Sequence, residues 1–131
     1  MNAQTFIDAL HAVEDRGDVE PMAALHADDA ELRNPTHRTP QRGPDGARHF
    51  WASYRGAFGT IRSDFHHVVD GDGASLMEWT SEGTLADGTP VRYGGVTVVE
   101  WADGRVRRFR AYFDPADLTT VAGSGGSGER R

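Results

Sequence analysis

Two titratable side chains on neighbouring predicted strands form the pair best suited to proton transfer in this sequence. Glu78 lies in the segment Ser-Leu-Met-Glu-Trp-Thr-Ser-Glu-Gly, and His67 lies in the strand-like run before it. Every second side chain of a strand faces the same side, and we expect Glu78 and His67 to face a pocket. Burial there would raise the pKa of the Glu78 carboxyl and suit it to general acid or base work. His67 titrates in the same range and would assist as a proton relay.

Both residues also have a structural interpretation. Glu78 would equally form an ion pair with Arg107, and a single strand histidine is more often a hydrogen-bonded polar residue than a catalyst. His66 is the neighbour of His67, so a slip of one residue would exchange which of the two faces the pocket. The sequence leaves these alternatives open.

Asn34 is the third candidate catalytic residue, because it would hold a water or a substrate carbonyl. Asn before a proline also initiates turns by bonding its own backbone, and both roles stay open. The rest of the expected pocket wall is aromatic and apolar with a few hydroxyl groups, which is the profile of a small-molecule site. Its candidate ligand-binding residues are Trp51, Tyr54, Thr80, Tyr93, Thr97, Phe109 and Phe113.

The strands that would carry these residues are marked by three evenly spaced Asp-Gly dipeptides, a turn chemistry typical of tight hairpins. They are Asp72-Gly73, Asp87-Gly88 and Asp103-Gly104. Runs rich in β-branched and aromatic residues lie beside them. The pattern predicts four antiparallel strands over residues 61–69, 75–85, 91–101 and 105–113.

The first half of the chain has helical periodicity. Apolar residues spaced by three and four predict a helix over residues 3–16, with Gly17 as its stop. A second short helix would follow Asp18, and a third would begin at Pro44 and end at Gly59. Between the last two we expect a turn at 28–30, a short strand at 31–34 and a loop at 36–43.

Together these elements predict an α+β fold. We expect a cone-shaped half-barrel, in which a strongly curved antiparallel sheet (the four-strand meander plus the short strand) holds three N-terminal helices over its concave face. Residues 1–118 would form a single domain, and residues 119–131 a flexible Gly/Ser tail. Trp79 and Trp101 would lie on the convex face, where exposed tryptophans would favour a homodimer.

Composition excludes several classes of protein. The net charge of −6 over 131 residues argues against a nucleic-acid partner. No apolar run approaches the roughly 18–20 residues of a membrane span. The sequence has no cysteine, hence no disulfide or thiolate metal site, and no other metal-ligand spacing is present. With no visible signal peptide, we expect a cytoplasmic protein without cofactor or metal.

The order of the predicted elements, and the turn residues between them, resemble those of the nuclear transport factor 2-like superfamily. The resemblance is to its branch of SnoaL-like proteins, ketosteroid isomerases and limonene epoxide hydrolases. Three stretches carry the resemblance: Gly17-Asp18, His26 to Pro35 (HADDAELRNP) and Asp103 to Leu118 (DGRVRRFRAYFDPADL). The likeness extends from about Thr5 to Leu118. The same alignment sets the expected strand register, in which Leu76, Glu78, Thr80 and Glu82 face the pocket.

The resemblance also shows where this chain departs from its relatives. Ketosteroid isomerases carry an aspartate base where this sequence has Asn34, a tyrosine at Leu10 and a second aspartate at Thr97. Limonene epoxide hydrolases share the asparagine, whereas Glu78 and Thr80 stand at their arginine and first aspartate.

The cyclase aspartate falls at Ala111, so the usual acids of the superfamily are replaced throughout. The resemblance therefore implies a cofactor-independent enzyme of the SnoaL-like type, acting by proton transfer (isomerisation, cyclisation, dehydration or hydration) on a small hydrophobic oxygenated ligand. A non-catalytic small-molecule binding module of the same fold is the alternative.

Overall fold

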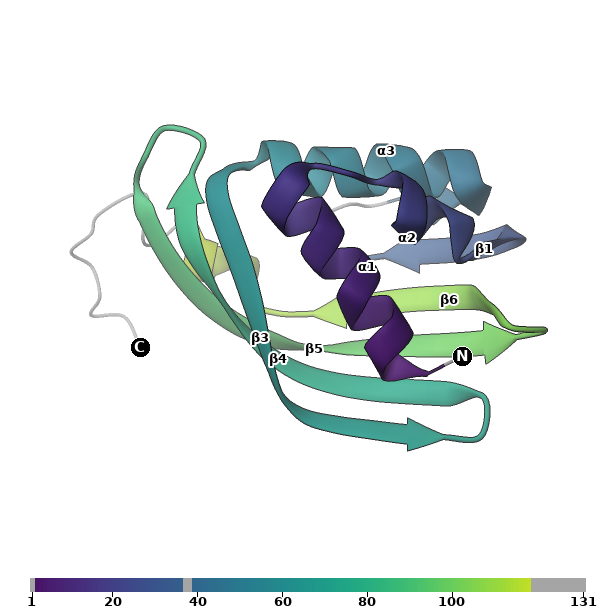
Figure 1. The fold of residues 1–131 in the computed structure, drawn as a ribbon. Helices are drawn as coiled ribbons and strands as arrows, with labels where there is room; N and C mark the ends of the chain where they lie inside the picture. Colours follow the sequence, from purple (N-terminus) through teal and green to yellow (C-terminus); the bar gives the residue numbers. More distant parts are fainter. Residues whose placement is uncertain (1, 37–38, 119–131) are drawn as a thin grey trace.

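A curved, unclosed six-stranded sheet wraps around the N-terminal helices in the computed structural model (Figure 1). The structure describes residues 2–36 and 39–118; the predicted tail at 119–131 lies outside them. The strand order is β2-β1-β6-β5-β4-β3, with β1 parallel to β6 and every other pair antiparallel. The predicted α+β fold is confirmed. The elements are α1 Ala3–Arg16, α2 Glu20–Ala24, β1 His26–Arg33, β2 Gln41–Arg42, α3 Gly43–Gly56, β3 Phe58–Gly71, β4 Ala74–Leu85, β5 Pro90–Ala102 and β6 Arg105–Tyr112.

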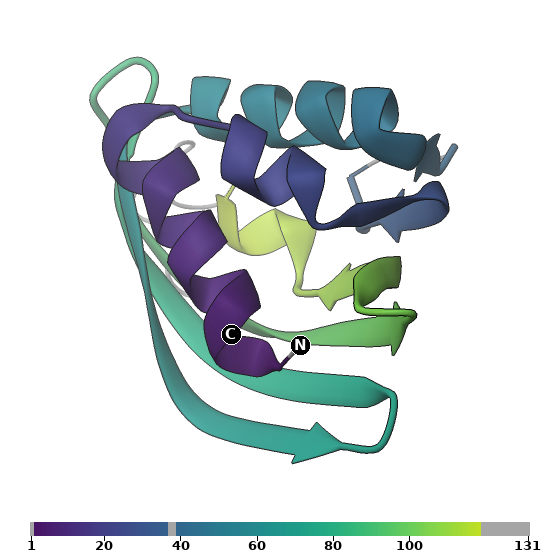
Figure 2. The same ribbon diagram turned by 45° about the vertical axis from the view of Figure 1, so that its right-hand side comes forward.

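Helix α1 has the predicted limits, and local chemistry sets both of them. The Asn2 side chain accepts a hydrogen bond from the Thr5 N–H at the start, which satisfies a donor that the helix itself cannot. At the end Gly17 adopts a left-handed conformation (φ 69°), and its N–H donates to the Val13 carbonyl. The face between these caps is buried against the sheet, and Figure 2 shows α1 lying inside the curve of the strands.

Three predicted boundaries in the first half were wrong. The expected turn at 28–30 is part of β1, which absorbs it as an irregularity in its pairing with β6. Residues 41–42 of the expected loop form β2, which pairs with β1. Helix α3 stops at Gly56 rather than Gly59, because Phe58 already pairs with Leu85 as the first residue of β3.

The four-strand meander is confirmed. Its three Asp-Gly turns close with Gly73, Gly88 and Gly104 at φ between 77° and 92°, a conformation that glycine adopts without strain. The sheet bends over the helices, and a core of apolar side chains from α1, α2, α3 and the inner face fills the space between them.

Strand β4 is turned over relative to the prediction. Its buried side chains are Ser75, Met77, Trp79 and Ser81, whereas Leu76, Glu78 and Glu82 are exposed. The pairing with β5 gives the reason. Trp79 lies opposite Gly95, and a Cβ added to that glycine would come within 2.8 Å of the indole. Glycine therefore leaves room for the large ring on the inner face.

The two tryptophans predicted to lie on the convex face are not exposed there. Trp79 is buried (8 % exposed), and Trp101 is half-buried against the main core with its N–H donating to Ser75. The expectation of a homodimer thus loses its original basis and remains a prediction.

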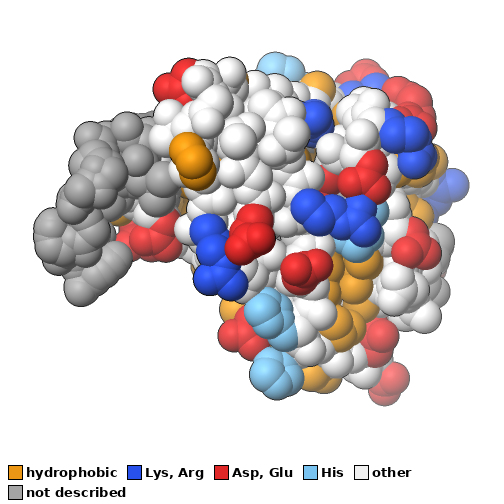
Figure 3. All heavy atoms as spheres, turned by 60° about the vertical axis from the view of Figure 1, so that its left-hand side comes forward, with side chains coloured by type: hydrophobic (Ala, Val, Ile, Leu, Met, Phe, Trp, Pro, Cys, Tyr) orange, Lys and Arg blue, Asp and Glu red, His pale blue; other side chains and the backbone are white. Residues whose placement is uncertain are grey.

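The outer face of the sheet is instead polar and of mixed charge. Ion pairs join Arg92 to Glu82, and Arg108 and Arg110 to Glu100. Figure 3 shows one side of the molecule, on which acidic, basic and histidine side chains lie beside hydrophobic ones. No helix in the described part of the chain is long and apolar enough to cross a bilayer.

Candidate active site

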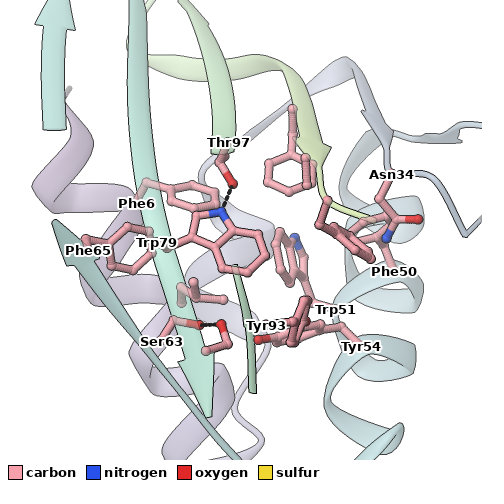
Figure 4. A pocket seen from close by; sticks show the side chains of 15 residues that line it. Phe6, Asn34, Phe50, Trp51, Tyr54, Ser63, Phe65, Trp79, Tyr93 and Thr97 are labelled. Carbon is pink, nitrogen blue, oxygen red and sulfur yellow. Dashed lines mark hydrogen bonds between the residues drawn. The ribbon is translucent and has the colours of Figure 1, made fainter. Parts of the chain in front are cut away.

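A cavity of about 60 Å³ lies between the helices and the inner face of the sheet. Its wall is mostly aromatic, and the rings come from α1, α3 and four strands (Figure 4). The lining residues are Phe6, Leu10, Asn34, Phe50, Trp51, Tyr54, Ser63, Phe65, Trp79, Ser81, Tyr93, Thr97, Phe109, Ala111 and Phe113. Such an apolar wall with few polar groups suits a small, largely apolar ligand.

All but one of the predicted ligand-binding residues line this cavity. They are Trp51, Tyr54, Tyr93, Thr97, Phe109 and Phe113. The exception is Thr80, which lies on the outer face of β4 and bonds His66. Thr97 has a partner inside the cavity, because its hydroxyl accepts a hydrogen bond from the Trp79 indole at 2.9 Å.

Beneath the cavity wall lies a buried carboxylate that the sequence analysis missed. Glu14 on α1 is only 2 % exposed. Its Oε1 accepts the Ser63 N–H at 2.8 Å, and its Oε2 accepts the Ser63 and Tyr54 hydroxyls at 2.6 and 2.7 Å. Three neutral donors thus stabilise the charge of this buried carboxylate.

The position of Glu14 has a sequence signal. It lies four residues after Leu10 and eight after Phe6, which places it on the apolar face of α1. A charged residue on the buried stripe of a helix needs partners inside the protein. A comparison of the acidic positions with the apolar stripe of the predicted helix therefore identifies Glu14 as a residue that points inward.

Two tyrosines belong to the same buried region. Burial first, and the Glu14 charge second, hold the pKa of the Tyr54 hydroxyl well above its usual value. The pKa of Tyr93 is raised by the same two causes in the same order. Both phenols are therefore neutral at physiological pH and can donate a hydrogen bond or transfer a proton.

Asn34 stands where the cavity opens to the surface. Asn34, Ala111 and Phe113 also line a neighbouring surface hollow. The Asn34 Oδ1 accepts hydrogen bonds from the Thr36 N–H and hydroxyl at 2.8 and 2.7 Å, so the turn-initiating role is present. Its Nδ2 has no partner among the described residues, which leaves that amide able to meet a ligand at the entrance.

Glu78 and His67 were predicted to face the pocket, and the structure places them on the outer face of the sheet. The Glu78 side chain is 54 % exposed and accepts a hydrogen bond from the His67 ring at 2.7 Å. A bulge between Phe65 and His67 in the pairing of β3 with β4 turns both histidines outward. The two residues do meet, but in solvent and away from the cavity. Arg107, the alternative partner of Glu78, is also exposed.

The described residues contain no group of three or more histidine, aspartate or glutamate side chains able to hold a metal ion. The polar atoms at the cavity are instead hydroxyls, two indole nitrogens and one amide. These groups can donate hydrogen bonds to oxygen atoms of a ligand, and the hydroxyls can also transfer protons.

The profile of the SnoaL-like domain matches residues 3–109 of this sequence. The chain belongs to the SnoaL-like domain family. No curated protein matches it in sequence.

Solved structures place this SnoaL-like chain within the nuclear transport factor 2-like fold. TerC, crystallised with polyporic acid, is 20 % identical with a TM-score of 0.78, covering 92 % of this chain and 97 % of TerC. An LEH-like epoxide hydrolase from M. tuberculosis is 22 % identical with a TM-score of 0.68, covering 90 % of this chain and 89 % of the hydrolase. A nuclear transport factor 2-like protein of unknown function from Burkholderia pseudomallei is 19 % identical with a TM-score of 0.80, covering 92 % and 96 %. Identities this low establish the fold alone.

The positions aligned with catalytic residues of other family branches divide in two. Leu10, Asn34, Thr97 and Ala111 line the cavity of this SnoaL-like chain, although none of them is an acid. The two aligned positions on β4, Glu78 and Thr80, lie outside it. The predicted inward orientation therefore matches the cavity lining at these four positions and is wrong on β4.

Proposed function

We propose that this chain is an enzyme of the SnoaL-like type that moves protons on a small hydrophobic oxygenated molecule held in the cavity. The observation that carries the proposal is the hydrogen bond between Tyr54, whose ring lines the cavity, and the buried Glu14 carboxylate. The pair connects the ligand space to a base shielded from water. The chain's own side chains supply every group that this chemistry needs.

The proton would move in one relay. A substrate C–H or O–H bond breaks, and its proton forms a new bond to the Tyr54 hydroxyl oxygen. At the same time the original Tyr54 proton passes to Glu14 Oε2, 2.7 Å away. The substrate keeps the electron pair as an enolate or alkoxide. Return of the proton at another atom gives isomerisation. Attack of the carbanion on a second carbonyl carbon of the same molecule, with the proton returned through Tyr54 to the new alkoxide, gives cyclisation. Departure of hydroxide from the adjacent carbon, with the proton returned to it to form water, gives dehydration.

Deuterium exchange into 1-indanone in D₂O, followed by proton NMR, tests the relay without knowledge of the natural substrate. We expect the protein to accelerate exchange of the protons next to the carbonyl, and Tyr54→Phe to lower that acceleration by about a hundredfold or more. Tyr112→Phe is the matched control, because Tyr112 is 55 % exposed and outside the cavity. Exchange that is equally fast in Tyr54→Phe and the wild type would contradict the relay.

A non-catalytic binding module is the second candidate, and one observation favours it. None of the described residues lining the cavity is an aspartate, glutamate or histidine, and both Glu14 oxygens already accept hydrogen bonds. Binding of 1-indanone without any accelerated exchange would establish this alternative.

We also propose that two copies associate through the outer face of the sheet. Val69, Leu76 and Tyr112 are exposed there, and Val96 and Val98 of β5 are only half-buried. Sedimentation of the wild type and of Leu76→Glu tests this: we expect a dimer that the variant weakens. We also propose a cytoplasmic location, because a chain without cysteine has no need of an oxidising compartment.

A further inference from the structure

Trp51 differs from the other two tryptophans of the chain in the hydrogen bonding of its indole N–H. Trp79 donates to the Thr97 hydroxyl and Trp101 donates to the Ser75 hydroxyl. The Trp51 nitrogen is buried and has no hydrogen-bond partner among the described residues. The residue as a whole is only 3 % exposed. Buried donors in native proteins almost always have an acceptor, so an unpaired one requires an explanation.

The surroundings of Trp51 explain why the protein itself does not supply that acceptor. Its indole contacts the rings of Phe50, Phe109, Tyr54 and Phe6, with ring centroids 4.9 to 6.0 Å apart. The contacts are edge-on, and they hold the indole in one orientation. Figure 4 shows it extending from α3 into the cavity, with the nitrogen directed into the space between the rings. The donor is therefore fixed in place at the wall of the cavity.

We propose that the Trp51 N–H is the binding donor for an acceptor oxygen of the ligand, and that it selects ketones and related carbonyl compounds among molecules that fit the apolar cavity. This inference rests on the proposed function, because it assumes that a small ligand enters the cavity. A hydrocarbon of the same shape would leave the donor unpaired, and a site built around a donor discriminates against such an analogue.

The position of Trp51 relative to the relay adds a role during proton transfer. Its ring and that of Tyr54 are 5.6 Å apart, and both line the cavity, so one ligand can contact both residues. When the proton leaves the carbon next to a ligand carbonyl, the electron pair moves toward the carbonyl oxygen. A preorganised N–H at that oxygen stabilises the developing negative charge more than it stabilises the ketone.

Isothermal titration with two probes of nearly equal shape tests the inference. 1-Indanone carries the acceptor oxygen, and indane lacks it. We expect the wild type to bind 1-indanone about tenfold more tightly than indane. Trp51→Phe should bind both probes equally while retaining its affinity for indane. Trp101→Phe, which removes a tryptophan outside the cavity, should keep the wild-type preference.

The outcomes separate the two proposals. Indane and 1-indanone binding equally to the wild type, or a preference that survives in Trp51→Phe, would overturn the role of Trp51 and leave the cavity as a ligand site. Failure of both probes to bind would overturn the proposed function and this inference together.

A second measurement needs no variant and remains decisive if Trp51→Phe does not fold. The three indole N–H groups give three separate signals in a ¹H–¹⁵N spectrum of the wild type. We expect 1-indanone to move the Trp51 signal downfield, as a new hydrogen bond does, and indane to leave it without that shift. The Trp101 signal should stay in place with both probes. A Trp51 signal that responds identically to the two probes would contradict the inference.

Discussion

Two glutamates on opposite sides of the same sheet show how environment decides what a carboxylate can do. Glu14 lies under the inner face, almost fully buried, and accepts three hydrogen bonds from neutral donors. Glu78 lies on the outer face, more than half exposed, and pairs with an exposed histidine. The outer pair resembles a catalytic dyad in sequence, yet solvent screens it. The inner carboxylate, which is hydrogen-bonded to the cavity-lining Tyr54, is the one connected to the cavity.

The largest expected difference between the two carboxylates is the loss of stability when each one is removed. Glu14→Ala leaves the Ser63 N–H and the Ser63 and Tyr54 hydroxyls without their acceptor, and we expect it to lower the free energy of unfolding by about 3 kcal/mol. Glu78→Ala should change it by no more than about 0.5 kcal/mol, because exposed ion pairs contribute little. Urea denaturation of both variants measures the difference. Equal costs would show that the two environments are not as distinct as described.

The inward orientation of the Trp79 side chain on β4 depends on Gly95 of β5, and a substitution at that glycine tests it. Gly95→Ala would place a methyl group against the Trp79 indole, at 2.8 Å, and against the Tyr112 carbonyl. We expect a loss of about 2 kcal/mol from overpacking. Gly56→Ala is the matched control: its Cβ would meet nothing within 4 Å, so thermal unfolding should show no loss. A Gly95→Ala variant as stable as the wild type would mean that Trp79 does not pack there.

The histidines provide a smaller, pH-dependent contrast between interior and surface. His26 is fully buried, its Nδ1–H donates to the Met22 carbonyl at 2.8 Å, and its Nε2 has no partner in the described structure. Burial lowers the pKa of its ring below the usual value, although the Met22 bond partly opposes this. Between the two pKa values the unfolded chain binds more protons, so His26 reduces stability as pH falls below about 6.5 and contributes no slope above it.

Unfolding measured between pH 5 and pH 8 checks this expectation. His26→Gln should flatten the decline below pH 6.5, whereas Gly56→Ala, which removes no titratable group, should leave the profile as in the wild type. A decline of the same size in His26→Gln and the wild type would contradict the assignment to His26.

The fold was predictable because its information is local and repeated. Turn glycines after aspartate, the caps of α1 and the apolar spacing along the helices each specify one element. The orientation of β4 was also available: Met77 and Trp79 alternate with Glu78, Thr80 and Glu82, which by itself favours tryptophan inward. The prediction followed the alignment with relatives instead, and this placed Glu78 inward and Trp79 outward.

The site was only partly predictable because it depends on contacts between distant segments. The bulge that turns His66 and His67 outward comes from the pairing of β3 with β4, and no residue in the sequence marks it. Likewise, Glu14 meets Ser63 across 49 positions of the chain. The aromatic wall was found because large apolar side chains on inner faces must pack together, whatever the register of one strand.

The most direct test of the inner carboxylate as the functional one is the rate of deuterium exchange into 1-indanone, compared between Glu14→Gln and Glu78→Gln. Both variants remove a single negative charge and keep the shape of the side chain. We predict that Glu14→Gln loses the acceleration of exchange while Glu78→Gln retains it in full. Loss of acceleration in Glu78→Gln, with exchange unchanged in Glu14→Gln, would place the chemistry on the outer face and contradict this account.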